Sequence, residues 1–360
     1  MAIQWADDFS RYGTGLSSRT AMLDGLPYSS LSTQTTGGFV TASPDPNDSA
    51  RTFFLDFNAN GETSDFRVAL PNVVSGTVGI CFRAWLANLP VSSQNRPNLV
   101  GVLRSDGGYV AYIRIEQNGS ITIHGRVGGV ITQVFDSINP IVQPNSFNHF
   151  EYLHNTSAGT GQLYVNGVLR CSYSGVDTGI SLVFASLSPR STGAQPMTNT
   201  WIKDLVIWDS TGSKNNTVMG TVIVRRQKPN GDITLGGWTP STGTSGFSLL
   251  AKDAPNDATF LSADDTPPAE MIFNMENLPA DVTSVRGLVT VIRSRKIDGG
   301  DGNLQTALSP NGTDWDNGED RPITSAFTYD FDVSELDPDT ADSWTPVAVD
   351  NIQLRIDRTV

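Results

Sequence analysis

The amino-acid sequence predicts an all-β protein of two antiparallel β-sandwich domains in tandem. Gly (34 residues) and Pro (20 residues) are frequent, as expected of short strands joined by tight turns. Apolar and polar residues alternate along most of the chain, which is the period of a strand. No segment has an amphipathic helical pattern longer than two turns. The length of 360 residues leaves each domain enough chain for a hydrophobic core.

The first half of the chain has the clearest strand patterns. One strand is expected to direct Arg83 and Trp85 to one face and five apolar side chains to the other, namely Val78, Ile80, Phe82, Ala84 and Leu86. Residues 109–116 and 120–127 predict two further strands, which an Asn-Gly turn joins. The strongest hairpin signal covers residues 161–170, where Asn166 and Gly167 tolerate positive φ.

Residues 201–208 predict the strand that closes the first domain, and the polar segment after it predicts a linker. We therefore place the first domain at residues 1–212 and the second, acidic domain at 213–360. The strand-like segments of the second domain are 218–224, 247–251, 271–275, 282–295, 327–333 and 352–356. Trp344 comes shortly before a proline and predicts a strand entrance, with its indole covering a sheet end.

Charge and cysteine content exclude several classes of function. The formal net charge is −13, and residues 213–360 contribute 22 acidic against 12 basic side chains. This balance argues against a nucleic-acid partner, which needs clustered Lys and Arg. No apolar run reaches membrane-spanning length, and residues 1–9 lack the features of a secretion signal. Cys81 and Cys171 are expected to be buried free thiols.

Motifs for catalysis are missing from the sequence. It has no phosphate-binding loop, dinucleotide fingerprint or nucleophile elbow. His149 and His154 are five residues apart, so on one strand they would face opposite sides and could not share a metal. The three-carboxylate strand of some glycoside hydrolases does not occur, and its nearest counterpart, residues 335–339, is interrupted by proline. We expect a protein that is not an enzyme.

Two weaker constellations suggest binding. Asp298, Asp301 and Asn303 gather oxygen ligands in one loop, as calcium sites do, but without the spacing of an EF-hand, and an acidic turn is the favoured interpretation. No other cofactor is expected. Trp315 lies between Asp314 and Asp316 and could stack on a sugar ring, although plugging the end of a sandwich is the favoured role.

Asp204 is an acidic residue in the middle of a predicted strand that is otherwise mostly apolar. There it should either face solvent or accept backbone hydrogen bonds.

Residues 148–152, 161–167 and 201–208 together resemble the signature of concanavalin A-like (laminin G-like) jelly rolls. In the second half, several segments occur in an order similar to that of tailed-bacteriophage virion proteins: residues 222–224, 229–232, 237–243, 264–265 and 337–350. This resemblance implies two jelly-roll domains and a particle component, and it implies no catalytic residue.

Three functions are compatible with the sequence. The favoured one is a structural or accessory part of a tailed-phage particle, such as a head decoration, a head fibre or a tail-fibre part, exposed on the virion and assembled in the host cytoplasm. It would contact other virion proteins as a homo-oligomer, without nucleic acid or membrane insertion. The second is a glycan-binding attachment protein that contacts a host surface glycan. A polysaccharide depolymerase is the least favoured.

Overall fold

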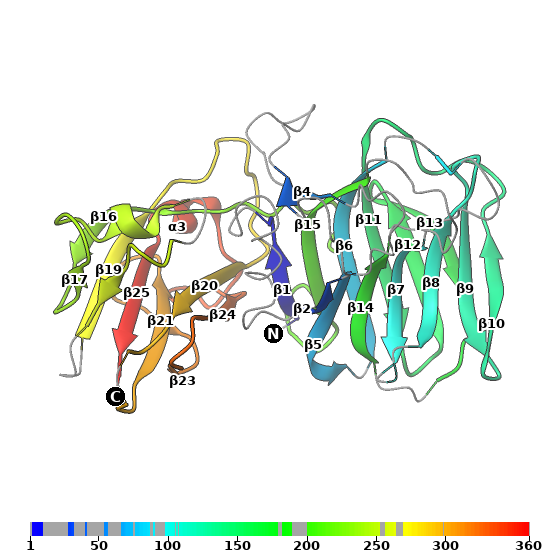
Figure 1. Ribbon diagram of the computed structural model, residues 1–360. Helices are drawn as coiled ribbons and strands as arrows, with labels where there is room; N and C mark the ends of the chain where they lie inside the picture. The colour runs from blue at the N-terminus through cyan, green and yellow to red at the C-terminus, as the bar shows by residue number, and fades with distance from the viewer. Residues whose placement is uncertain are drawn as a thin grey trace. The chain divides into compact units, whose positions relative to one another are not determined.

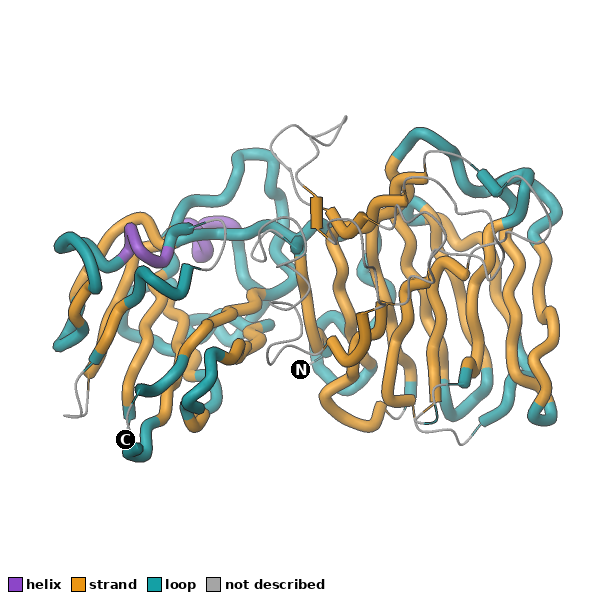
Figure 2. The backbone as a smooth tube through the Cα atoms, in the orientation of Figure 1, coloured by secondary structure: helices purple, strands orange, loops and turns teal. Residues whose placement is uncertain are grey.

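The computed structural model describes residues 2–9, 28–31, 40–41, 54–56, 66–74, 76–86, 89–90, 98–104, 106, 108–178, 182–188, 200–252, 256–263, 269–297 and 299–359. They form two compact units that divide after Val224, whereas the sequence predicts the division after Gly212. Strands dominate both units, and two short helical turns accompany them in the described part of the second (Figure 2). The all-β class is confirmed.

The first unit is built from two antiparallel sheets. One has eight strands in the order β13-β12-β11-β6-β15-β4-β3, with β1 paired to β15; the other has seven in the order β10-β9-β8-β7-β14-β5-β2. Figure 1 shows β7 to β10 in front of β11 to β13. The strands are β1 (Ile3–Asp7), β2 (Tyr28–Leu31), β3 (Val40–Thr41), β4 (Phe54–Asp56), β5 (Phe66–Val74), β6 (Thr77–Leu86), β7 (Asn98–Arg104), β8 (Tyr109–Ile115), β9 (Ile121–Val127), β10 (Val130–Asp136), β11 (Phe147–Asn155), β12 (Thr160–Val165), β13 (Val168–Tyr173), β14 (Leu182–Ser188) and β15 (Thr200–Asp209).

Alternation along β6 and β11 separates the core from the outer face of the eight-stranded sheet. The five apolar residues predicted to share one face of β6 are all buried, while Arg83 and Trp85 on the other face are partly exposed. Phe82 stacks on Phe150 of β11, with ring centroids 5.4 Å apart. The predicted hairpin is present, because β12 pairs with β13 and Asn166 has a φ of 53° in the turn between them.

The second unit is centred on a six-stranded antiparallel sheet in the order β16-β19-β25-β21-β22, with β23 also paired to β21. Two ribbons, β17-β18 and β20-β24, complete it (Figure 1). Its elements are β16 (Pro229–Thr234), β17 (Thr239–Pro240), α2 (Phe247–Leu250), β18 (Leu261–Ser262), β19 (Ala269–Met275), β20 (Leu288–Ser294), β21 (Asn303–Ser309), β22 (Asp316–Asn317), β23 (Arg321–Pro322), β24 (Thr328–Ser334), α3 (Pro346–Asp350) and β25 (Gln353–Arg358).

Apolar side chains of β19, β21 and β25 form the core of the second unit together with Trp344 and Val349. The Trp344 indole is 2% exposed, and its Nε1–H donates to Ser334 Oγ over 3.2 Å. The prediction of a strand entrance here was wrong, because helix α3 begins directly afterwards. Thr345 caps that helix by accepting a hydrogen bond from the Ala348 backbone N–H, and proline suits the first helical turn.

Two further strand predictions were wrong for tertiary reasons. Residues 218–224 pair with none of the described strands, because the backbone N–H groups of Met219, Val222 and Val224 donate to side chains of the first unit. Residues 247–251 begin as the helical turn α2 instead. The Asp232 carboxylate accepts hydrogen bonds from the Gly246 and Phe247 N–H groups at 2.9 and 2.6 Å, which satisfies the start of that turn.

Cys81 and Cys171 are free and buried, as predicted. Burial raises the pKa of the Cys171 thiol to about 12 and that of the Cys81 thiol well above its usual value. Neither thiol is therefore ionised at neutral pH, so they serve as small apolar side chains. Within the described ranges, no helix has the length and apolar character needed to cross a membrane.

Candidate functional site

Three aromatic side chains lie side by side on the outer face of the eight-stranded sheet. Strand register aligns Phe147 of β11 with Trp85 of β6, and Trp85 with Trp201 of β15. The ring centroids of Trp85 and Phe147 are 5.4 Å apart at an interplanar angle of 64°, and those of Trp85 and Trp201 are 6.1 Å apart at 30°. All three are partly exposed. We call Trp85, Phe147 and Trp201 the aromatic row.

The next cross-strand row places two cations against the Phe147 ring. Arg83 is paired with Lys203, and both point to the same face as the aromatic row. The Arg83 Cζ is 4.9 Å and the Lys203 Nζ 4.4 Å from the centroid of the Phe147 ring. Both distances are within the range of a cation–π interaction. The cations thus stabilise the arrangement of the aromatic row.

Residues 219–224, which we call the strap, cross the same face of the sheet. The Glu151 carboxylate accepts hydrogen bonds from the Met219 and Gly220 N–H groups at 2.6 and 3.1 Å. The Asp204 Oδ1 accepts one from the Val224 N–H at 3.1 Å, and its Oδ2 accepts one from Arg83 at 3.2 Å. Both carboxylates are at most 1% exposed. The strap therefore buries the acidic groups of this face.

Asp204 reaches the strap because β15 is irregular there. Its φ is 55°, and the pairing of β15 with β6 shifts register between Lys203 and Val206. A bulge of this kind redirects a side chain out of the regular alternation. Of the two roles predicted for Asp204, acceptance of a backbone hydrogen bond is confirmed and solvent exposure is wrong.

His149 and His154 face opposite sides of β11, as predicted. The His149 Nε2 accepts a hydrogen bond from the Val222 N–H of the strap at 3.4 Å, whereas the His154 Nδ1 lies 2.6 Å from the Tyr173 hydroxyl in the core. Burial lowers the pKa of His149 to about 4, with a further lowering from Arg83. Burial alone lowers the pKa of His154 to about 4. Both imidazoles are therefore neutral at pH 7.

The predicted Trp315 site has a partly exposed indole, and glycan binding there stays a prediction. The Arg355 Cζ lies 4.5 Å from the centroid of the Trp315 ring and covers one of its faces. Asp316 accepts a hydrogen bond from Ser334, and the exposed Asp314 accepts one from the Asn311 amide at 2.8 Å. Trp315 and Asp316 thus attach this loop to β25 and β24, and Asp314 is bonded within the loop.

The predicted calcium loop is only partly described, since Asp298 lies outside the described residues. Asp301 is exposed, and the Asn303 amide donates to Asp320 Oδ2 at 2.9 Å. In the described part of the chain, no three His, Cys, Asp or Glu side chains are grouped so that they could hold a metal. Calcium binding by this loop stays a prediction.

The aromatic row was not identified as a site from the sequence. Its signal was present in part, because alternation placed Trp85 opposite the apolar face of its strand. Trp201 also began the predicted strand 201–208. Alternation within a strand does not predict the register between strands, and that register brings these residues of three strands together.

The comparisons with known proteins agree with this architecture. The family described as the concanavalin A-like lectin/glucanases superfamily, in its laminin G type, matches residues 60–216. The first unit contains a concanavalin A-like jelly-roll domain. Searched against the curated proteins, the chain finds no match.

Solved structures similar to this chain share little sequence with it. The receptor-binding domain of a botulinum neurotoxin C/D mosaic serotype is 15% identical with a TM-score of 0.40, and the match covers 57% of this chain and 48% of that one. Domain 4 of an arabinanase from Geobacillus stearothermophilus, in complex with arabinotriose, is 13% identical with a TM-score of 0.37, and covers 58% and 92%. A galectin from Caenorhabditis elegans is 10% identical with a TM-score of 0.30, and covers 42% and 94%. This chain thus spans about half the length of the toxin domain.

Proposed function

We propose that this protein binds glycans and that the aromatic row of its jelly-roll domain contacts the sugar. The observation that carries the proposal is the alignment of three partly exposed rings on neighbouring strands. Clustered aromatic surface of this kind marks binding sites. An aromatic ring suits a ligand that is apolar on one side and wet on the other, as a sugar ring is. The family description of the jelly-roll domain supports the same function.

Arg83 supplies a polar group beside the rings. Its side chain is 16% exposed, and the described ion pair uses one of its terminal nitrogens for Asp204. A guanidinium has five N–H donors. Arg83 can therefore donate to a sugar hydroxyl while the Asp204 contact holds it in place.

Binding without cleavage is the activity that this face supports. Hydrolysis of a glycosidic bond needs two carboxyl groups that flank the bond. Two carboxylates on this face, those of Glu151 and Asp204, are buried and accept backbone hydrogen bonds from the strap. They are held away from a ligand stacked on the aromatic row, so we propose a protein that is not an enzyme.

We further propose that the protein is carried on the exterior of a tailed-phage particle as an attachment or accessory component. Support for this location comes from the ordered sequence motifs in residues 213–360. A homo-oligomer would present several aromatic rows at once, and such multivalency strengthens weak sugar binding. Mass spectrometry of purified particles should detect the chain, and light scattering of the pure protein should give a multiple of the monomer mass.

Glycan binding is tested with the full chain on a glycan array, followed by titration of the best ligand. Trp85→Ala and Trp201→Ala should each weaken binding about fivefold, since a lost ring contact is worth about 1 kcal/mol. Trp315→Ala is the matched control and should bind normally, because Trp315 is not part of the aromatic row and Arg355 covers one face of its ring.

The array also tests the proposal directly. A wild-type protein that binds no glycan would remove it. Equal loss in Trp315→Ala and Trp85→Ala would shift the site away from the aromatic row.

A further inference from the structure

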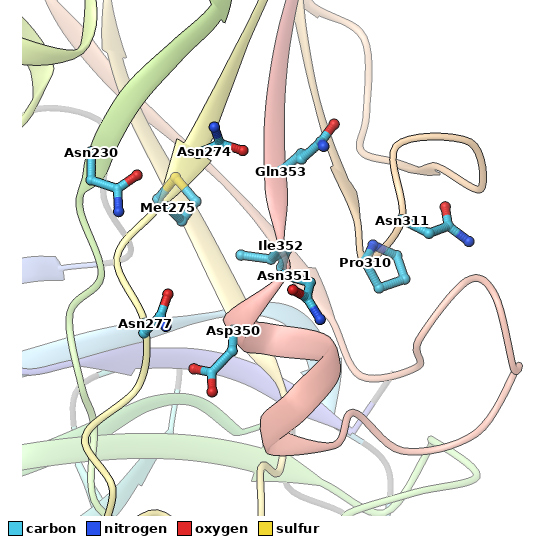
Figure 3. Close-up of a pocket in the computed structure, with 10 residues that line it drawn as sticks. All are labelled: Asn230, Asn274, Met275, Asn277, Pro310, Asn311, Asp350, Asn351, Ile352 and Gln353. Atoms are coloured by element: carbon cyan, nitrogen blue, oxygen red, sulfur yellow. The ribbon is translucent and has the colours of Figure 1, made fainter.

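A separate groove lies at one end of the six-stranded sheet of the second unit. It encloses about 560 Å³ and is lined by residues of β16 and β19, the turn after β21, and the segment from α3 into β25. Figure 3 shows Asn230 and Asn277 on one side, Pro310 and Asn311 on the other, and Ile352 between them. The volume is within the usual range of about 300–1,000 Å³ for a small-molecule site.

Side-chain amides dominate the lining of the groove. An amide both donates and accepts hydrogen bonds, as a sugar hydroxyl does. Asp350 is the one charged side chain among the described lining residues, and its Oδ1 accepts a hydrogen bond from the Leu278 N–H at 2.7 Å. The amide residues, which we call the amide groove, are Asn230, Asn274, Asn277, Asn311, Asn351 and Gln353.

Strand register and two glycines keep the centre of the groove open. Asn274 lies opposite Gly231 on one side and Gln353 on the other. Gly231 contributes no side chain beside Asn274. Gly312 has a φ of 77°, and a Cβ there would lie 3.0 Å from the Gln353 Oε1. A larger residue at either position would project toward the central amides.

Four of the six amide side chains are available to a ligand. Among the described residues, no hydrogen bond uses the side chains of Asn230, Asn274, Asn277 or Gln353. Asn311 is different, since Asp314 accepts from its amide and fixes it at the rim. Met275 and Ile352 add apolar surface between the amides.

We infer that the amide groove binds an uncharged, hydroxyl-rich ligand, a short neutral oligosaccharide. The lining contains no basic side chain that could pair with a carboxylate or sulfate. Residues 213–360, with 22 acidic and 12 basic side chains, would repel an anion. The inference goes beyond the aromatic row and does not depend on it, because the two sites use different residues in different units.

The test titrates the full chain with a panel of neutral trisaccharides: cellotriose, maltotriose, mannotriose, xylotriose and arabinotriose. The Asn230→Ala/Asn274→Ala variant should lose at least about tenfold in affinity for the ligand that wild type binds, since two or more hydrogen bonds are removed. Asn274→Asp should also weaken binding, because it keeps the shape but removes the N–H donors. Both positions are exposed, so the melting temperature should hardly change.

A background variant and a control separate this inference from the proposed function. Trp85→Ala/Trp201→Ala removes the aromatic row, so the groove variants are compared in that background. Glu276→Ala changes an exposed neighbour outside the groove and should bind as the background does. Trisaccharide binding that survives Asn230→Ala/Asn274→Ala overturns the inference. So does a wild-type protein that binds none of the five trisaccharides, an outcome that leaves array binding by the aromatic row intact.

Discussion

The aromatic row and the amide groove place different chemistry on the same kind of scaffold. In the first unit, three rings form a surface for stacking, with cations against Phe147, and Glu151 and Asp204 are buried under the strap. In the second unit, amides surround an open groove whose described lining has no aromatic ring and one carboxylate. An antiparallel sheet fixes the spacing of the side chains on its face, and the types of those side chains determine which ligand the face can bind. Four experiments, from the largest expected effect to the smallest, test whether the two regions act independently.

Acidification should give the largest difference in stability between the two units. His149 and His154 have a pKa of about 4 in the folded protein against an ordinary 6.5. Their contribution to stability is therefore complete above pH 6.5 and is lost as the pH falls toward 4. At pH 5 the loss is roughly 2 kcal/mol for each histidine. All three histidines of the chain lie in the first unit.

The stability of the second unit should change with pH in the opposite direction. Burial raises the pKa of Asp330 and Asp357. The stabilisation from these groups is present below their ordinary pKa of 3.8 and is lost as the pH rises through the raised value. Chemical denaturation at pH 7 and pH 5 should thus show the first unit weakening selectively. His149→Gln should remove about half of that change, and an unaltered pH response would contradict the assignment.

Loss of the strap contact should come next. Glu151→Ala would leave the Met219 and Gly220 N–H groups without the carboxylate that accepts from them. Removing charged hydrogen bonds in a buried site costs about 3 kcal/mol, measured as the free energy of unfolding of the first unit. Glu151→Gln keeps one acceptor oxygen and should lose less. Binding in the amide groove should not change, and a parallel loss there would show that the units are coupled.

The effect of aromatic-row variants on trisaccharide binding should be smaller. The double variant Trp85→Ala/Trp201→Ala should weaken binding of the array ligand more than either single change and leave trisaccharide affinity within about twofold of wild type, as expected of independent sites. Isothermal titration with both ligands measures this directly. A ligand lost to both sets of variants would show that one glycan spans the two sites.

Gly312 should give the smallest effect and the best-matched control. Gly312→Ala places a Cβ at positive φ and against Gln353, which should cost about 1 kcal/mol of stability and weaken trisaccharide binding severalfold. Gly243→Ala has a similar φ of 72° with no atom near the added Cβ. It should lose the same stability and retain full affinity. Equal affinities for the two variants would argue against a role for Gln353.

The sequence was most informative where a local rule determined the outcome. Alternation placed Phe82 in the core and Trp85 outside, and the Asn166-Gly167 turn fixed the hairpin of β12 and β13. The odd spacing of His149 and His154 correctly placed them on opposite faces of β11. For the candidate sites, the sequence prediction selected Trp315, whereas our proposal, which depends on strand register, selects Trp85 and Trp201.

The sequence by itself determined the β class, the strand faces and the buried thiols, because these follow from period, turn chemistry and side-chain polarity over a few residues. Only the tertiary structure decided the rest. The pattern of residues 218–224 is typical of a strand, but in the structure Glu151 and Asp204 accept hydrogen bonds from their backbone N–H groups. The pattern of residues 247–251 is also typical of a strand, but Asp232 accepts the hydrogen bonds that begin the helical turn α2. Both sites also depend on register between strands far apart in the chain. Such partners are selected by the packing of the whole sheet, which no local pattern specifies.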